Sequence, residues 1–197
     1  KGTLEIGAPV KEAVLSEQLG ISRAPIREAL QVLVQEGLIT SEPQKGKHVR
    51  QMTGKEIYDS YVVAGILEGA GVAESLPLWT EANMETFRSV VRQMEGKISY
   101  ATKLDELAEI DELFHATLFM ACDNTRLVEM ARTSCATISK YLYYQHWITM
   151  FTPREYADRH HAVAEAVYSR DVKHVETALR DHYKETGLRM AQFGKEA

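Results

Sequence analysis

The sequence predicts a mostly α-helical protein: a small N-terminal unit of two helices and a β-hairpin, followed by an all-α bundle of about six helices. Three observations support this fold class. The 197 residues include only 12 glycines and 5 prolines. Apolar residues recur with helical spacing from residue 54 onward, and strand-like segments are confined to the part before residue 53. We therefore expect two domains, 1–52 and 53–197.

The N-terminal unit has clear start and stop signals. A helix over residues 13–20 ends at Gly20, and a second helix begins at the N-cap Ser22 and ends at Gly37. The following segment, LITSEPQKGKHVRQM (38–52), predicts two short strands around a turn. Two helices joined by a tight turn and followed by a hairpin form a winged helix-turn-helix, a unit whose second helix can enter the major groove of DNA.

The second domain begins at a capping box, Thr53-Gly54-Lys55-Glu56. No stretch approaches the roughly 18 consecutive apolar residues of a membrane span. Two cysteines, Cys122 and Cys135, are too few for a disulfide framework and indicate reduced thiols in a cytoplasmic protein. The expected helices are 54–74, 81–97, 103–121, 124–150, 153–168 and 171–193.

Positive charge in the first unit is placed where DNA could be read. The whole chain has a net charge of −5, but residues 1–50 carry seven Lys/Arg against six Asp/Glu. Arg23 and Arg27 lie four residues apart on the helix face opposite its apolar residues, and an arginine fork suits guanine or phosphate. Lys45 and Gly46 occupy the hairpin turn. The alternative is that these are ordinary solvated surface charges.

The string LSEQLGISRAPIREALQVLVQEGLI, followed by Lys45-Gly46, resembles the winged-helix head of the GntR family of bacterial transcription regulators. The resemblance implies that Ser22, Arg23 and Arg27 contact operator DNA, and that the wing around Lys45-Gly46 reaches the neighbouring minor groove. Two departures accompany it. Ala13 stands where members of the family often carry an arginine that contacts DNA, and the first helix of the family's head has no counterpart in this sequence.

Four residues of the second domain have a spacing that suits a metal ion. Asp111 and His115 are four apart on one helix face. His160 lies eleven residues before Asp171, at the turn between the last two helices, and His182 lies eleven after it. Equal distance from the turn of an antiparallel hairpin places two residues at the same height. One carboxylate and three imidazoles suit Zn²⁺, Ni²⁺ or Mn²⁺. The alternative is a set of separate core or surface histidines.

These residues also resemble a known domain. The DxxxH motif at 111–115, followed by His160-x-Ala162-Val163, Asp171 and His182, resembles the FCD effector domain of the FadR subfamily. The resemblance implies that the Asp and the three His hold a divalent metal, Zn²⁺ first among the candidates. Ala64 replaces an arginine that helps many relatives to hold carboxylate effectors. The candidate effector contacts are Arg126, Lys140, Tyr143 and Tyr144, although the run YLYYQHW can equally pack between helices or subunits.

We therefore expect a bacterial, cytoplasmic transcription regulator, a homodimeric repressor that is nucleoid-associated when bound to DNA. Its double-stranded operator would be an inverted repeat, because a dimer must match two half-sites. Its affinity would be modulated by a small organic or sugar acid at the metal site, and no membrane is involved. Two alternatives remain: a metal-dependent enzyme in which the Asp/His₃ site activates water, or a regulator whose metal is purely structural. Because no nucleophile elbow, phosphate loop or cofactor fingerprint occurs, we expect no enzyme.

Overall fold

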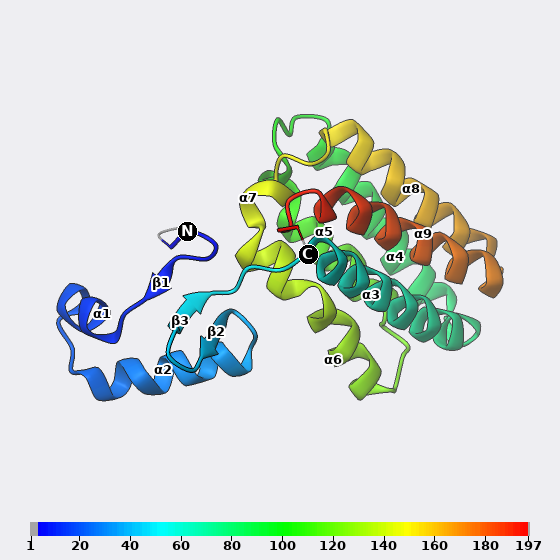
Figure 1. Cartoon of the computed structure of the whole chain (residues 1–197). Helices are drawn as coiled ribbons and strands as arrows, with labels where there is room; N and C mark the ends of the chain where they lie inside the picture. Colours follow the sequence, from blue (N-terminus) through cyan, green and yellow to red (C-terminus); the bar gives the residue numbers. More distant parts are fainter. Residues whose placement is uncertain (1–3, 197) are drawn as a thin grey trace.

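The computed structural model describes residues 4–196, which form a small head (residues 4–52) and a larger helical body (residues 53–196) (Figure 1). The predicted fold class is confirmed. The head consists of β1 (Pro9–Val10), α1 (Glu12–Leu19), α2 (Arg23–Gln35), β2 (Ile39–Glu42) and β3 (Gly46–Val49). The body consists of α3 (Gly54–Ser75), η1 (Leu76–Leu78), α4 (Glu81–Ile98), η2 (Leu104–Leu107), α5 (Ala108–Leu118), α6 (Thr125–Ser134), η3 (Thr137–Leu142), α7 (Tyr144–Trp147), α8 (Pro153–Ser169) and α9 (Val172–Ala191).

The head is a winged helix-turn-helix with a three-stranded antiparallel sheet in the order β1-β3-β2. Gly20 ends α1 in the left-handed conformation at φ 67°, as its position predicted. The short strand β1 was not predicted, because two residues are too few to show alternation; it pairs Pro9 with His48 of β3. A small core of Val10, Ile26, Leu30 and Ile39 joins the sheet to α2.

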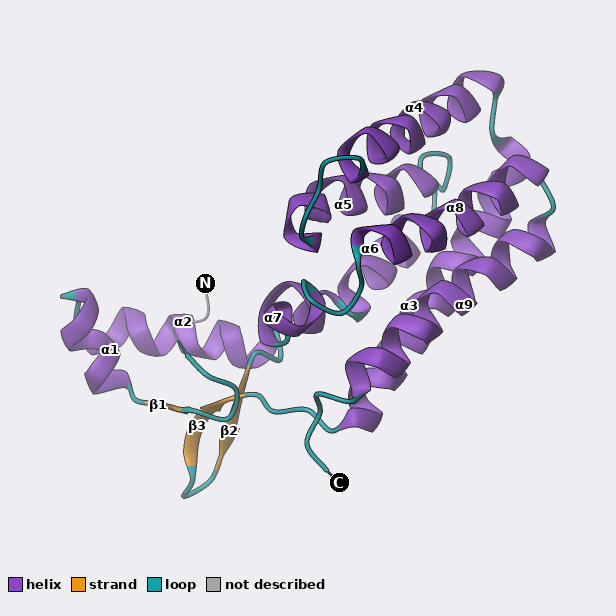
Figure 2. Cartoon of the chain, turned by 90° about the horizontal axis from the view of Figure 1, so that it is seen from above, coloured by secondary structure: helices purple, strands orange, loops and turns teal. Residues whose placement is uncertain are grey.

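Two glycines allow α3 and α9 to pack closely along their length (Figure 2). A Cβ atom at Gly65 would lie 2.8 Å from the Cβ of Tyr183, and one at Gly187 would lie 2.8 Å from the Cβ of Tyr61. Larger side chains would therefore separate the helices. This close approach carries both tyrosines into the interior of the body. The main core of the body forms between α4, α5, α8 and α9, around residues such as Phe87, Phe114 and Leu179.

The predicted helix 124–150 is wrong as a single element. It consists of α6, a π-helical turn (η3) and the short helix α7. The residues at the breaks, Cys135 and Tyr143, have φ near −118° and −114°, outside the usual helical range. No glycine or proline marks either break, so the apolar periodicity continued across them. The predicted helix 103–121 is also divided, since its first turn is the 3₁₀ helix η2.

One helical stretch, Gly54–Leu78, is long and apolar enough to cross a membrane by length and composition alone, with an 18-residue window of mean hydropathy 1.2. This differs from the expectation drawn from the sequence. Half of that window is buried within the fold, and α3 lies against α9 and α6. A helix in the core of a fold passes the same test, and α3 packs in this way against α9 and α6.

Candidate functional site

The exposed face of α2 carries the two arginines predicted to read DNA. Ile26 and Leu30 are the buried residues of α2 and fix its orientation on the sheet. Arg23 and Arg27 are exposed. Ser22 occupies the N-cap position, but its side chain makes no capping hydrogen bond. The N-terminus of α2 therefore presents a hydroxyl and two guanidinium groups to solvent, an arrangement that suits phosphate oxygens and base edges.

The wing turn is also exposed. Lys45 forms an ion pair with Glu42 at 2.7 Å, and its side chain is 74% exposed. Gly46 has φ 81°, a left-handed conformation that favours glycine, and a Cβ there would meet no described atom within 4 Å. The turn can therefore approach another surface closely.

The sequence did not single out Glu12, which links the two predicted DNA-contacting elements. Its Oε2 lies 3.2 Å from Nη2 of Arg27, and its Oε1 lies 3.1 Å from Nζ of Lys47 in β3. Hydrogen bonds from Lys47 and Arg27 lower the pKa of Glu12, so this carboxylate stays charged. One acidic residue thus pairs with a cation on α2 and another on the wing.

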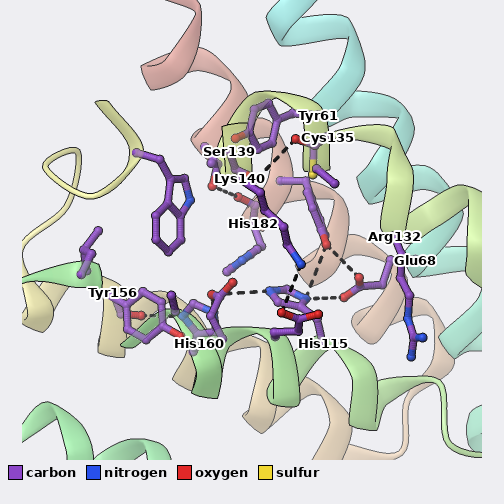
Figure 3. A pocket seen from close by; sticks show the side chains of 18 of the residues that line it. Tyr61, Glu68, His115, Arg132, Cys135, Ser139, Lys140, Tyr156, His160 and His182 are labelled. Atoms are coloured by element: carbon purple, nitrogen blue, oxygen red, sulfur yellow. Dashed lines mark hydrogen bonds and ion pairs between the residues drawn. The ribbon is translucent and has the colours of Figure 1, made fainter. Parts of the chain in front are cut away.

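In the body, three histidines from three helices converge (Figure 3). His115 lies on α5, His160 on α8 and His182 on α9. One ring nitrogen of each lies within 4.8 Å of the other two. Oδ1 of Asp111 is 3.2 Å from Nε2 of His160 and 4.0 Å from Nε2 of His115. The structure therefore brings together all four residues predicted as metal ligands.

The ring orientations leave nitrogens available in the interior. Nδ1 of His160 lies 2.8 Å from the backbone oxygen of Tyr156, which turns Nε2 toward the cluster. Nε2 of His160 and Nδ1 of His182 are both buried; Nε2 of His160 lies beside the carboxylate of Asp111, and Nδ1 of His182 has no hydrogen-bond partner among the described residues. Buried polar atoms in proteins are usually satisfied. A cation bound among these nitrogens would give Nδ1 of His182 a partner.

Glu68 and Tyr183 hold the third ring, and the sequence did not predict either role. Oε1 of Glu68 lies 2.7 Å from Nδ1 of His115, and the hydroxyl of Tyr183 donates to Oε2 of Glu68 at 2.8 Å. Glu68 is only 3% exposed. A carboxylate on the outer nitrogen of a histidine fixes the ring and leaves Nε2 for a metal. A single acidic residue within the apolar run ILEGAGVA was the signal available in the sequence.

The protonation states of two of the three histidines and of Asp111 suit a bound cation, whereas His115 must first lose a proton. Burial disfavours the charged ring of His115, but the charge and hydrogen bond of Glu68 and the charge of Asp111 outweigh it and raise the pKa of His115 to about 9. Burial lowers the pKa of His160, and burial together with the charge of Arg159 lowers the pKa of His182. Burial opposes ionisation of Asp111, but His160 and His115 outweigh it and lower its pKa. Two neutral imidazoles and an ionised carboxylate are good ligands for Zn²⁺-like ions.

The cluster lines a cavity of about 440 Å³ that is large enough for a small molecule. Apolar walls come from residues such as Phe119, Trp147 and Phe151, and polar groups include Ser139, Lys140 and Arg159. Burial raises the pKa of Cys135, another lining residue, to about 12, so its thiol is not a ready nucleophile.

Two of the four predicted effector contacts lie on the cavity wall, namely Lys140 and Tyr144. The other two lie elsewhere. Arg126 is exposed on α6 and forms an ion pair with Glu129 at 3.1 Å. Tyr143 is buried and bonds through its hydroxyl to the backbone of Met52. Spacing within the aromatic run could not show which tyrosine faces the cavity, because the run lies in and after a π turn.

Comparison with known proteins gives two family matches. Residues 59–185 match the model of the FCD domain, and residues 1–49 match the model of bacterial regulatory proteins of the gntR family. The chain is 26% identical over 193 residues to the HTH-type transcriptional repressor RspR of Escherichia coli (strain K12), covering 96% of this chain and 82% of the relative. It is 30% identical over 124 residues to the gluconate operon transcriptional repressor of Bacillus subtilis (strain 168), covering 63% and 50%. Among solved structures, E. coli McbR/YncC has the same fold, with a TM-score of 0.72, 20% identity, and coverage of 97% of this chain and 90% of that one.

Proposed function

The chain belongs to the gntR family of bacterial regulatory proteins and carries an FCD domain, which makes it a DNA-binding transcription regulator, and we propose that it is a repressor controlled by a small organic or sugar acid bound beside a metal ion. The domain boundary would lie between residues 52 and 53. The protein would act in the cytoplasm, associated with the nucleoid when bound to DNA.

In this proposal the head reads an operator. Arg23 and Arg27 on the exposed face of α2 contact bases or phosphates, and Ser22 contacts a phosphate at the helix N-terminus. Lys45 and Gly46 of the wing approach the adjacent minor groove. Two copies of the chain would bind an inverted repeat, because a symmetric dimer presents two recognition helices about one turn of DNA apart.

The observation that carries the metal proposal is the convergence of nitrogens of His115, His160 and His182 within 4.8 Å. One of these rings also has a buried nitrogen, Nδ1 of His182, with no hydrogen-bond partner among the described residues. Asp111 would complete the ligand set from the same helix as His115. When bound, a divalent metal such as Zn²⁺, with Ni²⁺ or Mn²⁺ as alternatives, supplies a positive charge and open positions to which an acid can bind. Glu68 orients His115 for this role.

The cavity supports an acidic effector through residues other than those that relatives use. Ala64 is fully buried and does not line the cavity, so it offers no charge there. Lys140 lines the cavity, with its Nζ 3.1 Å from Glu112 at the wall. Arg159 also lines it, but its guanidinium already pairs with Glu185 at 2.8 Å. Lys140 can exchange Glu112 for a ligand carboxylate, and we assign it to the effector; Arg132 is a further cation of the cavity wall.

The test begins with selection of binding sites from random duplex DNA by the metal-loaded protein. We expect an inverted repeat to be enriched, and the double substitution Arg23→Ala/Arg27→Ala to weaken binding to it by about 100-fold or more, at roughly 1–3 kcal/mol per lost base contact. Arg92→Ala, an exposed arginine on α4, is the matched control. Unchanged affinity in the double variant would refute the DNA interface.

A second arm tests the ligand site. We expect Zn²⁺ to raise the melting temperature of metal-stripped wild type but not of His160→Ala, and an acid such as citrate to change operator affinity when the metal is present. If Zn²⁺ stabilises the protein while no acid in a panel of organic and sugar acids alters operator affinity, the metal is structural and the effector proposal is wrong.

A further inference from the structure

The segment that joins head to body is bonded to a tyrosine 91 positions further along the chain. Met52 lies between β3 and α3 and is 5% exposed. Its N–H donates to the hydroxyl of Tyr143 at 3.0 Å, and that hydroxyl donates to the carbonyl oxygen of Met52 at 3.2 Å. The N–H of Lys195 also donates to this carbonyl oxygen, at 2.9 Å. The position of the connecting segment is therefore tied to Tyr143.

Tyr143 directly follows the π turn η3, which also forms part of the cavity wall. The N–H of Tyr143 donates to the carbonyl oxygen of Ile138 at 2.8 Å, the five-residue spacing of a π-helix. Ser139 and Lys140, from the same turn, line the cavity. A group bound in the cavity would therefore contact this six-residue turn, and the segment leading to the head is bonded to the residue that directly follows it.

Apolar packing makes the connection continuous. Tyr143 belongs to a buried cluster with Met52, Ile57, Tyr61, Ile138 and Met190. Tyr61 also lines the cavity, as does Trp147, which packs against this cluster. Ile6, from the N-terminal part of the head, packs against the cluster as well. The wall of the cavity and the attachment point of the head therefore share side chains.

We propose that Tyr143 couples the cavity to the head: a ligand that contacts Ser139 and Lys140 changes the register of the π turn, and the hydroxyl of Tyr143 transmits the change to Met52. This inference rests on the proposed control of the regulator by a ligand in the cavity. It adds the route by which that ligand acts on DNA binding.

The π turn provides the two discrete arrangements that such coupling requires. A π turn contains one residue more than an α turn, so conversion to α-helix rotates the following residue by about 100° around the helix axis. Such a rotation would carry the phenol of Tyr143 away from Met52 and break both hydrogen bonds. A ligand shifts this equilibrium to the extent that it binds one register more tightly than the other. Lys140 lies in the turn and pairs with Glu112, so a ligand that binds Lys140 can have different affinities for the two registers.

A nearby residue supplies a matched control. Tyr141 lies in the same π turn, but its side chain is 64% exposed. Tyr141→Phe and Tyr143→Phe each remove one hydroxyl from this segment. The Tyr143 ring remains available for packing in Tyr143→Phe, so the substitution removes the hydrogen bonds to Met52 and leaves the cluster filled.

The experiment measures operator affinity and amide hydrogen exchange of the full chain with no addition, with Zn²⁺, and with Zn²⁺ plus citrate. In the wild type we expect one of these probes to change operator affinity by about fivefold or more and to change the exchange rate of the Met52 amide in parallel. In Tyr143→Phe without a probe, we expect Met52 exchange to accelerate roughly five- to tenfold, because a hydrogen bond is lost. Operator affinity should then no longer respond, while Zn²⁺ affinity stays unchanged. Tyr141→Phe should behave as the wild type.

The outcomes separate this inference from the proposed function. If operator affinity responds equally in wild type and Tyr143→Phe, the coupling role of Tyr143 is wrong and ligand control stands. If neither Zn²⁺ alone nor Zn²⁺ with any acid of the panel of organic and sugar acids alters wild-type operator affinity, control by a metal-bound acid is refuted, and the coupling with it. If Tyr143→Phe does not fold, the wild type still decides: a change in operator affinity without any change in Met52 exchange overturns the proposal.

Discussion

Replacing Glu68 by glutamine removes the carboxylate that pairs with His115 beside the proposed metal site, and should change how zinc binding depends on pH. Glu68→Gln keeps the size of the side chain but removes the carboxylate that lies 2.7 Å from Nδ1 of His115. Burial opposes the charge on His115, and Glu68 and Asp111 outweigh it to give a pKa of about 9. Without Glu68, burial prevails and the pKa of His115 falls.

The magnitude in the wild type follows from competition between a proton and the metal. A metal binds the neutral ring, so with the pKa of His115 at about 9 one proton must leave at pH 7. That competition costs about 100-fold in affinity, or about 2.7 kcal/mol at 1.36 kcal/mol per unit. Zinc affinity should therefore rise about tenfold per pH unit from about pH 6.5 and level off above about pH 9. In the metal-free protein, the free energy of unfolding depends on pH in the opposite direction. The His115–Glu68 pair stabilises the fold fully below about pH 6.5, and this stabilisation is lost as the pH rises through about 9.

Two opposing effects determine the affinity of the Glu68→Gln variant. Loss of the orienting carboxylate costs about 10- to 100-fold in metal affinity. Loss of the competing proton raises the Zn²⁺ affinity about 100-fold at pH 7, but it leaves the affinity unchanged above about pH 9, where the wild-type ring is already neutral. The variant should therefore bind Zn²⁺ about as well as the wild type near neutral pH and clearly more weakly at about pH 9, with a nearly flat profile between them.

The assay is competition for Zn²⁺ with a chromophoric chelator across this pH range, together with calorimetry in two buffers of different ionisation enthalpy. At pH 7 the wild type should release about one proton on binding, and the variant about none. Glu109→Gln, a charge removal at another residue lining the cavity, should leave the wild-type profile intact. Parallel profiles for wild type and Glu68→Gln would refute the assigned role of Glu68.

Three further predictions concern other parts of the molecule. Glu12→Gln should tighten binding to non-specific DNA and reduce the preference for the operator. The salt dependence of non-specific binding should become steeper by about one unit of slope for each additional phosphate neutralised. If Glu17→Gln, on the same helix, causes equal changes, the effect comes from net charge alone. Gly187→Ala should destabilise the protein by about 2 kcal/mol in urea unfolding, because the added methyl group overlaps α3 at 2.8 Å; an unchanged midpoint would show that the helices can separate freely. His160→Ala should abolish stabilisation by Zn²⁺ while His161→Ala retains it, since His161 pairs with Glu95 away from the cluster; loss in both would argue against the assigned ligands.

Much of this fold was predictable because its signals are local. Gly20, Gly37 and the capping box at Thr53 stand where the structure ends or begins a helix. The equal spacing of His160 and His182 from the turn at Asp171 placed them across from each other, and their ring centroids lie 4.7 Å apart. Such patterns depend on helix geometry alone.

The residues that escaped prediction depend on contacts between distant segments. Glu68 meets His115 across 47 positions, and the hydroxyl of Tyr143 meets Met52 across 91. The carboxylate of Glu12 owes its importance to Lys47, 35 positions away. No periodicity records such pairs. The division of the helix 124–150 was equally hidden, because apolar residues suit a π turn as well as an α-helix.

The body begins and ends at one place. Thr53 and Lys195 form a β-bridge, and the N–H of Gly54 donates to the carbonyl oxygen of Lys195 at 3.3 Å. A domain whose two ends lie next to each other can be inserted into a loop of another protein without distorting either protein. Residues 53–195 are therefore a natural cassette for biosensor engineering: inserted into a loop of a fluorescent protein, the cassette would report occupancy of its cavity as a change in light emission, without any operator.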